Sequence, residues 1–102
     1  MTRRVVWSPE AKTDLQQISA YLGNEAPGQS DRVIDRLDEA GEGLGRALTG
    51  RPGRMSGTYE KSLPDIHYIL AYYVDRSTEN SAVLILRIIH SSRNWRPGHW
   101  PK

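Results

Sequence analysis

The sequence predicts a single α+β domain, in which an N-terminal strand and an antiparallel helical hairpin precede a three-stranded antiparallel meander. Two early stretches repeat apolar residues at steps of three and four, the spacing of amphipathic helices. Three later stretches are rich in β-branched and aromatic residues and are separated by turn sequences. The length, 102 residues, suits one hydrophobic core. We expect one domain over residues 1–102, with a core at about 3–91, a tail at 92–102 and both helices on one face of the sheet.

The N-terminal part predicts a strand followed by two helices. Residues 3–7 read as a short strand, and Ser8 is a good N-cap for a helix over residues 9–22. Gly23 supplies the stop signal of that helix. A second helix begins near Pro27, and the short connection predicts an antiparallel hairpin.

Three glycines lie in the second half of the second helix, at positions 41, 43 and 45. Each costs about 1 kcal/mol relative to alanine in a helix interior. Either the end of the helix is loose, or the missing side chains let another backbone come close. On sequence alone we favour the loose end.

The second half of the chain predicts the sheet. Residues 49–57 form a turn-rich loop whose Arg51 and Arg54 read as exposed charges. Strands are expected after this loop at residues 58–63, 66–74 and 82–90. Short turns join them, so they are antiparallel neighbours. The last strand is apolar on both faces except for Arg87, which predicts a central position.

Alternation along the last two strands assigns residues to faces. On the last strand one face carries Leu84, Leu86, Ile88 and His90, and the other carries Val83, Ile85, Arg87 and Ile89. On the strand before it, one face carries Ile66, Tyr68, Leu70, Tyr72 and Val74, and the other carries His67, Ile69, Ala71 and Tyr73. The face with Arg87 should be the uncovered one, because a lone buried guanidinium is costly. We favour partner binding there over coverage by the folded-back tail.

Composition excludes several classes of protein. Cysteine is absent, so there is no disulfide framework, thiolate metal site or cysteine nucleophile. No apolar run approaches the roughly 20 residues of a membrane span. Because no apolar signal-peptide core comes after the N-terminal arginines, we expect a cytoplasmic protein. No second histidine lies at metal-ligand spacing from His90, and we expect neither metal nor cofactor.

Charge is unevenly distributed along the chain. Residues 1–50 carry 6 basic and 8 acidic side chains, and residues 51–102 carry 8 basic and 4 acidic ones. From Asn80 onward there is no carboxylate, while aromatic residues are interleaved with Arg87, Arg93, Arg96 and Lys102. Such a tail suits an acidic partner, either nucleic acid or protein, but a solvated basic C-terminus is an equal alternative.

Five segments of the chain carry a wider pattern. They are Val6-Trp7-Ser8-Pro9-Glu10-Ala11-x-x-Asp14-Leu15-x-x-Ile18-x-x-Tyr21-Leu22; Arg32-Val33-Ile34-Asp35-Arg36-Leu37; Gly50-Arg51-Pro52-Gly53-Arg54; Tyr68-Ile69-x-x-Tyr72; and Ile85-Leu86-Arg87-Ile88-Ile89-His90-x-x-Arg93-x-Trp95. In this order and spacing they resemble the ParE toxins of the RelE/ParE superfamily. The resemblance covers about residues 4–97.

The resemblance implies a toxin of a bacterial type II toxin–antitoxin pair, active in plasmid stabilization. ParE proteins typically act on DNA gyrase and are held inactive by a ParD-like antitoxin in a hetero-oligomer. The family fold agrees with the element order derived above. No enzyme activity and no direct sequence-specific DNA binding by the toxin alone are expected.

On this basis two sets of binding residues are expected. The target-binding set is Arg87, His90, Arg93 and Trp95, and the antitoxin-binding set is Tyr59, Ile69, Tyr73 and Ile85. Each has a structural alternative. Arg87 would form a local ion pair, Trp95 would pack as core, and the tyrosines would be half-buried sheet residues.

Two other functions remain open. RelE-like relatives cut messenger RNA on the ribosome, which needs a base, an acid and cations for the phosphate. Here Tyr68-Ile69 stands where that branch has Tyr-Arg, and Trp95 stands at the position of its C-terminal tyrosine. His90 remains a candidate base or acid. A non-toxic antitoxin binder is the third reading, because Tyr59 replaces the arginine usual in ParE proteins.

Overall fold

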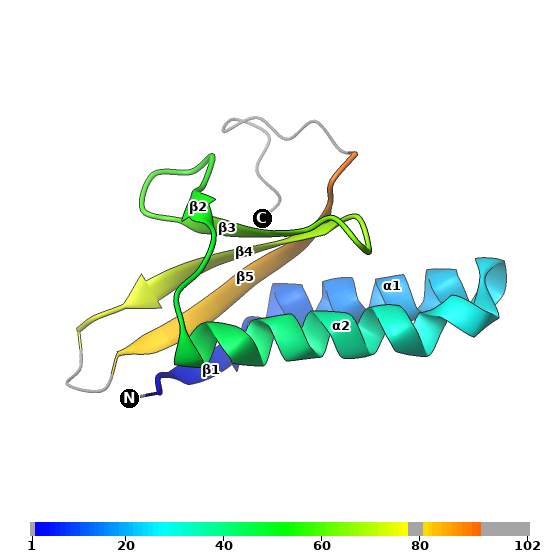
Figure 1. Ribbon diagram of the computed structural model, residues 1–102, viewed down its shortest axis with the longest axis horizontal. Helices are drawn as coiled ribbons and strands as arrows, with labels where there is room; N and C mark the ends of the chain where they lie inside the picture. The colour runs from blue at the N-terminus through cyan, green and yellow to red at the C-terminus, as the bar shows by residue number, and fades with distance from the viewer. Residues whose placement is uncertain (1, 78–80, 93–102) are drawn as a thin grey trace.

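Two helices cover one face of a five-stranded mixed sheet in the part of the chain that the structure, a computed structural model, describes: residues 2–77 and 81–92 (Figure 1). The elements are β1 (Arg4–Trp7), α1 (Pro9–Glu25), α2 (Pro27–Arg46), β2 (Arg51–Pro52), β3 (Tyr59–Leu63), β4 (Tyr68–Asp75) and β5 (Ala82–His90). The predicted α+β class, the helical hairpin and the one-sided packing are therefore confirmed.

The sheet has the strand order β1-β5-β4-β3-β2. β1 runs parallel to β5, with Arg4 opposite Ala82 and Trp7 opposite Ile85, and the other pairs are antiparallel. The predicted central position of β5 is confirmed, because β5 lies between β1 and β4. The two-residue β2 was not predicted, and it lies within the stretch expected to be a loop.

The start of α1 agrees with the sequence prediction, and its end does not. The Ser8 hydroxyl accepts a hydrogen bond from the Ala11 amide at 3.0 Å, as expected for an N-cap. The helix continues past Gly23 to Glu25, and Ala26 alone separates it from α2. The Ala26 amide donates to the Leu22 carbonyl at 2.8 Å, so the chain turns within one residue. Figure 1 shows the hairpin end extending beyond the sheet.

The glycines of α2 permit a close crossing of β1, and the expected loose helix end is wrong. The helix stays regular to Arg46. A Cβ on Gly41 would lie 2.3 Å from Cζ2 of Trp7, and a Cβ on Gly45 would lie 2.6 Å from the carbonyl oxygen of Arg3. These distances are far below normal contact. The missing side chains therefore let β1 lie directly against the helix.

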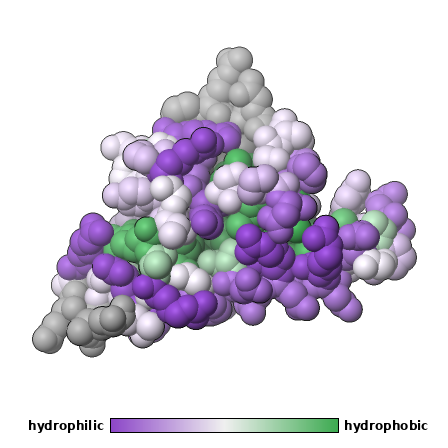
Figure 2. All heavy atoms as spheres, viewed as in Figure 1, coloured by the Kyte–Doolittle hydropathy of each residue, from purple (hydrophilic) through white to green (hydrophobic). Residues whose placement is uncertain are grey.

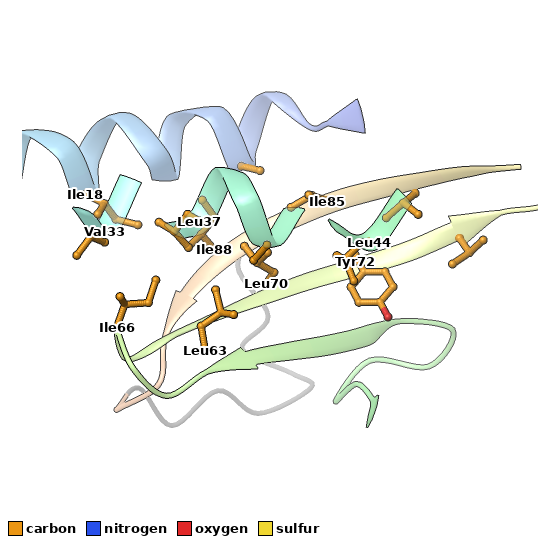
Figure 3. Close-up of a cluster of buried hydrophobic side chains, with 14 residues drawn as sticks. Ile18, Val33, Leu37, Leu44, Leu63, Ile66, Leu70, Tyr72, Ile85 and Ile88 are labelled. Atoms are coloured by element: carbon orange, nitrogen blue, oxygen red, sulfur yellow. The ribbon is translucent and has the colours of Figure 1, made fainter. Parts of the chain in front are cut away.

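The main core fills the space between the helices and the sheet (Figure 3). Its fully buried larger side chains include Leu37 and Leu44 of α2, Leu70 and Tyr72 of β4, and Ile85 of β5. The predicted alternation along β4 is confirmed. Neither helix has an apolar stretch long enough to cross a membrane, among the residues described.

The predicted faces of β5 are wrong in its first half. Tyr72 pairs with Ile85, whereas Ala71 pairs with Arg87, so Leu86 is an extra residue in a β-bulge. Because the bulge shifts the alternation, Val83 and Ile85 face the helices together with Ile88. The face assignment holds after Leu86 and is inverted before it.

Candidate functional site

Residues at the start of α1 form hydrogen bonds with the edge of β5 beyond the end of β1. The Ser8 amide donates to the Ile85 carbonyl at 2.9 Å, and the Ser8 hydroxyl donates to the Leu86 carbonyl at 2.8 Å. One turn further, the Asp14 carboxylate accepts a hydrogen bond from the Ile88 amide at 2.9 Å. These backbone groups of β5 thus bond to Ser8 and Asp14 where β1 no longer pairs with the strand.

Arg87 is bound by the same carboxylate. Its Nε donates to Asp14 Oδ2 at 2.8 Å and its Nη2 donates to Asp14 Oδ1 at 2.9 Å, a bidentate pair. Asp14 is 7% exposed, and the Arg87 side chain is 19% exposed. The expectation of a lone arginine on an open face is therefore wrong, because the guanidinium has an intramolecular partner.

Three aromatic rings gather at the end of β5. The rings of Tyr68 and His90 meet edge to face at a centroid distance of 5.2 Å, and His67 stacks beside His90 at 6.4 Å. The Ser92 amide donates to His90 Nδ1 at 3.2 Å, and the Ser92 hydroxyl lies 2.6 Å from the same nitrogen. His67 has a positive φ of 63° in the turn before β4.

These rings form one wall of a groove of about 670 Å³. Residues of α1 from Asp14 to Leu22 also line it, and so does Arg87, the partner of Asp14. We call this the hairpin groove, and its lining includes Gln17, Tyr21, Ile66, His67, Tyr68 and His90. Figure 2 shows hydrophobic residues in a band between the helices and the sheet, with hydrophilic residues over the outer side of the helices.

The four residues expected to bind antitoxin do not share one surface. Tyr59 pairs with the core residue Tyr72, and the two rings stack at 5.7 Å, so Tyr59 projects on the helix side. Tyr73, the next residue along β4, projects on the opposite side, and both tyrosines are exposed. Ile69 is 4% exposed in a small cluster with Ala71 and Ile89. Ile85 is 0% exposed within the main core, so it offers a partner no surface.

Of the target-binding set, the structure places Arg87 and His90 beside the hairpin groove. Arg93 and Trp95 lie outside the described residues. Within residues 2–77 and 81–92, no group of three or more histidine, aspartate or glutamate side chains is arranged to hold a metal ion.

A buried glutamate organises the loop between β2 and β3. One Glu60 carboxylate oxygen accepts a hydrogen bond from the Arg54 amide at 2.9 Å and lies 3.4 Å from Arg54 Nε. Its other oxygen lies 4.0 Å from Nη2 of the exposed Arg51. The loop arginines are therefore tied to the sheet by Glu60, a role that the sequence did not reveal.

The segment after α2 is hydrogen-bonded to a tyrosine hydroxyl of β4. Tyr72 is buried and its hydroxyl donates to the Thr49 carbonyl. Burial raises the pKa of Tyr72 above its ordinary value, because the phenolate loses its hydration there. The hydroxyl therefore stays a donor at neutral pH.

One feature of the sequence does point to the hairpin groove, although the sequence alone does not predict it. Residues 15–24 of α1 carry no charged side chain, in a chain of which 25% is charged. That run contains Tyr21, whose exposure of 62% is the highest of the large hydrophobic side chains in the described part of the chain. Uncharged surfaces that contain tyrosine are typical of interfaces.

Comparison with known proteins agrees with the fold and the motifs. A family model described as ParE toxin of type II toxin–antitoxin system, parDE, matches residues 5–95. The toxin-like protein Y4kP of Sinorhizobium fredii is 34% identical over 94 residues, which cover 91% of this chain and 93% of that protein. Toxin RelE2 of Caulobacter vibrioides is 32% identical over 91 residues, covering 88% and 97% of the two chains.

Solved structures of toxin–antitoxin systems share the fold. A chain of the chromosomal ParDE system from P. aeruginosa superposes with a TM-score of 0.74 at 18% identity, covering 87% of this chain and 96% of that one. A chain of the RelBE2 toxin–antitoxin complex from Mycobacterium tuberculosis gives 0.64 at 25% identity, covering 88% and 99%. The family match spans nearly the whole described domain. The chain therefore belongs to the ParE family of toxins of type II toxin–antitoxin systems, within the RelE/ParE superfamily.

Proposed function

We propose that this toxin inhibits DNA gyrase by binding to it, without catalysis, and that a ParD-like antitoxin neutralises it. The observation that carries the proposal is Ile69. It occupies the position where the nuclease branch has an arginine, and it is 4% exposed among apolar neighbours. A phosphate or a developing charge finds no cation there.

The other cations near the groove are also poorly suited to phosphate chemistry. Both carboxylate-facing donors of Arg87 are used by Asp14. The sole lysine between Lys12 and Lys102 is Lys61, on β3. A binding function needs none of these groups. Its expected contact element is the end of β5 with the residues just after it: His90, Arg93 and Trp95.

The membership of the chain in a toxin–antitoxin family supports an antitoxin partner. Its structural neighbours come from ParDE and RelBE toxin–antitoxin systems. Exposed Tyr59 and Tyr73 are proposed contacts, because tyrosine supplies area and a hydrogen bond at low entropic cost. Action on gyrase implies a cytoplasmic toxin, with plasmid stabilization as the role of the pair.

Ribosome-dependent cleavage of messenger RNA is the second candidate. One observation favours it: His90, Tyr68 and Arg87 line the same groove, so an imidazole, a phenol and a guanidinium lie close together. The relative from Caulobacter also carries the name Toxin RelE2. These groups would supply a base, an acid and a charge.

Gyrase supercoiling with the purified toxin, alone and with its antitoxin, is the deciding experiment, run beside ribosome-programmed cleavage of a message. We expect inhibition that the antitoxin relieves. Arg93→Ala and Trp95→Ala should each weaken inhibition at least tenfold. The matched control is Arg76→Ala, an exposed loop arginine after β4, which should leave inhibition unchanged.

Cleaved message with uninhibited gyrase would reject the gyrase proposal, and His90→Ala would then be expected to abolish cleavage. Silence in both assays would identify a non-toxic member. Tyr59→Arg, which restores the usual family residue, would be the next variant in that case.

A further inference from the structure

The face of the sheet that points away from the helices carries a small apolar cluster of its own. Its members are Ile69 and Ala71 of β4 and Ile89 of β5, and we call it the outer cluster. Side chains alternate along a strand, so these residues point away from the main core, which contains their chain neighbours Leu70 and Ile88. Ile69 and Ile89 lie directly opposite each other on the paired strands. They form one apolar patch across β4 and β5.

The outer cluster is buried, although both helices lie on the other side of the sheet (Figure 1). Ile69 is 4% exposed and Ile89 is 2% exposed. The open face of an antiparallel sheet is normally solvated and carries polar side chains. Because these exposures are those of the chain by itself, some part of this chain covers the two isoleucines.

Burial on this face is confined to one end of the sheet. Tyr73 lies four positions after Ile69 on β4, about 13 Å along the strand, and it is 38% exposed. Its partner on β5, Leu84, is half-buried on the same face. The covering segment therefore lies over the end of the sheet where β5 stops, and it leaves Tyr73 open.

The described side chains beside the two isoleucines do not account for this burial. Ser62, which pairs with Ile69, is small. Arg87 is on the outer face, but its guanidinium is directed to α1 by its ion pair. The loop between β2 and β3 is tied to Glu60, whose partner on β4 is Ala71, two positions from Ile69. The cover must come from a segment beyond these neighbours.

The chain leaves the described structure at this same end of the sheet. Ser91 and Ser92 form a turn directly after β5, and the Ser91 amide donates to the His67 carbonyl at 2.9 Å. Serine is common where a chain reverses. Ile89 lies three residues before Ser92, and Trp95 follows three residues after it. Because equal lengths of chain extend from the turn, a reversal there brings Trp95 back over Ile89.

The composition of residues 93–102 suits a covering segment. Two tryptophans supply large apolar surfaces, no carboxylate has to be kept hydrated, and the prolines at 97 and 101 prevent pairing as a regular strand. By the same counting, Trp100 would come back near Leu84, since both are eight residues from Ser92. Leu84 is only half-buried. Trp95 is therefore the tryptophan that fits the buried end.

We propose that the C-terminal segment, residues 93–102, folds back over the outer face of the sheet and that the indole of Trp95 covers Ile69 and Ile89. This end of the outer face is then occupied by the chain itself, in place of the partner expected there. The docking requires no assumption about gyrase or antitoxin. It makes Trp95 part of the fold as well as of the proposed gyrase-binding element, whose first residues are held against the sheet.

Nuclear magnetic resonance of the full wild-type chain, with labelled isoleucine methyl groups, tests the contact directly. We expect nuclear Overhauser effects between the Trp95 indole and the methyl groups of Ile69 and Ile89. Trp95→Leu should shift these two methyl resonances, because it removes the ring current while keeping an apolar side chain. Trp100→Leu is the matched control and should leave both resonances in place. The methyl of Ile18, in the main core, should move in neither variant.

The absence of cysteine allows a second test by thiol labelling. In the full chain, the thiol of Ile69→Cys should react at least tenfold more slowly than that of Tyr73→Cys, which is on the same face but exposed. Adding Trp95→Ala should accelerate labelling of Ile69→Cys at least tenfold, whereas adding Trp100→Ala should change it less than twofold. Leu70→Cys, on the helix side, should stay protected with Trp95→Ala, which separates local opening from unfolding.

Three results would overturn the inference. The first is a wild-type spectrum without indole contacts to either methyl group. The second is equal labelling of Ile69→Cys and Tyr73→Cys in the free toxin, including the case in which Ile69→Cys becomes protected only when antitoxin is added. The third is protection of Ile69→Cys that Trp95→Ala leaves unchanged. None of these measurements involves gyrase or a message, so a failure here is distinct from a failure of the proposed function.

Discussion

The carboxylate of Asp14 on α1 accepts two hydrogen bonds, of 2.8 and 2.9 Å, from the guanidinium of Arg87 on β5. The two residues are 73 positions apart in the sequence. The same carboxylate holds the Ile88 amide. One side chain therefore joins the helical hairpin to the last strand at the point where β1 no longer pairs with it. The stability of that junction can be measured.

Asp14→Ala should destabilise the protein by about 3 kcal/mol, because it leaves the Arg87 charge and the Ile88 amide without their partner in a mostly buried place. Urea denaturation measures the change. The double variant with Arg87→Ala should lose less than the sum of the two single changes, since it removes the unpaired charge as well. Asp38→Ala, on the exposed side of α2, is the control. A loss below about 0.5 kcal/mol for Asp14→Ala, the range of ordinary surface substitutions, would contradict the role given to this pair.

The three glycines of α2 should respond to alanine in opposite directions. At Gly41 and Gly45 the new Cβ would collide with Trp7 and with the backbone of Arg3, so each change should cost about 1–3 kcal/mol. At Gly43 the nearest atom is Nη2 of Arg46 at 3.8 Å, so alanine should stabilise the helix by about 0.5–1 kcal/mol. Thermal unfolding of the three variants decides the matter. Equal gains at all three positions would show that β1 does not lie against the helix.

Removal of Glu60 should free the loop between β2 and β3. Glu60→Ala deprives the Arg54 amide and side chain of their carboxylate and should cost about 2 kcal/mol. Trypsin should then cut faster after Arg54, while Arg51 is protected by the proline next to it in the chain. Mass spectrometry of a timed digest locates the cut. Glu42→Ala, at an exposed position on α2, should be cleaved at the wild-type rate. An unchanged cleavage rate for Glu60→Ala would contradict the role of Glu60 in holding Arg54.

Alkaline pH should weaken the fold through Tyr72. The pKa of this group is raised in the folded protein, so above its ordinary value of 10.0 the unfolded chain binds fewer protons than the folded one. Stability therefore falls as pH rises from about 10 toward the raised pKa. Tyr72→Phe should lose about 1 kcal/mol near pH 8, with its bond to Thr49, and should show a flatter decline at high pH. Tyr73→Phe, at an exposed hydroxyl, should keep the wild-type slope.

The sequence revealed the elements better than their contacts. Periodicity along β4 predicts that Leu70 and Tyr72 share a face, and they do, because alternation is a local property of a regular strand. Ile85 was placed on the wrong face because a bulge at Leu86 depends on how two strands pair, and alternation along one strand contains no record of it. The sequence shows the glycines of α2, but the reason for Gly41 and Gly45 lies in a distant segment, the side chain of Trp7 and the backbone of Arg3.

The candidate site shows the same limit. Arg87 and His90 were singled out from the sequence, and both border the groove that the structure contains. Asp14 was not recognised as the partner of Arg87, because nothing local marks an aspartate on α1 as the acceptor for a strand 73 residues later. The exposure of Tyr21 could not be predicted either, since helical spacing alone does not say where the sheet beneath a helix ends.

The parallel pairing of β1 with β5 sets the order of events during synthesis of the toxin. Arg4 lies opposite Ala82, and the Ser8 hydroxyl reaches Leu86, so the two ends of the domain close on each other over 78 residues. At a translation rate of about 5–20 residues per second, β5 is synthesised about 4–16 seconds after β1. A chain that stops before β5 lacks the strand that joins β1 to β4. Chains that end before β5 therefore cannot close the sheet, and the part of the hairpin groove lined by His90 forms only after that strand has been made.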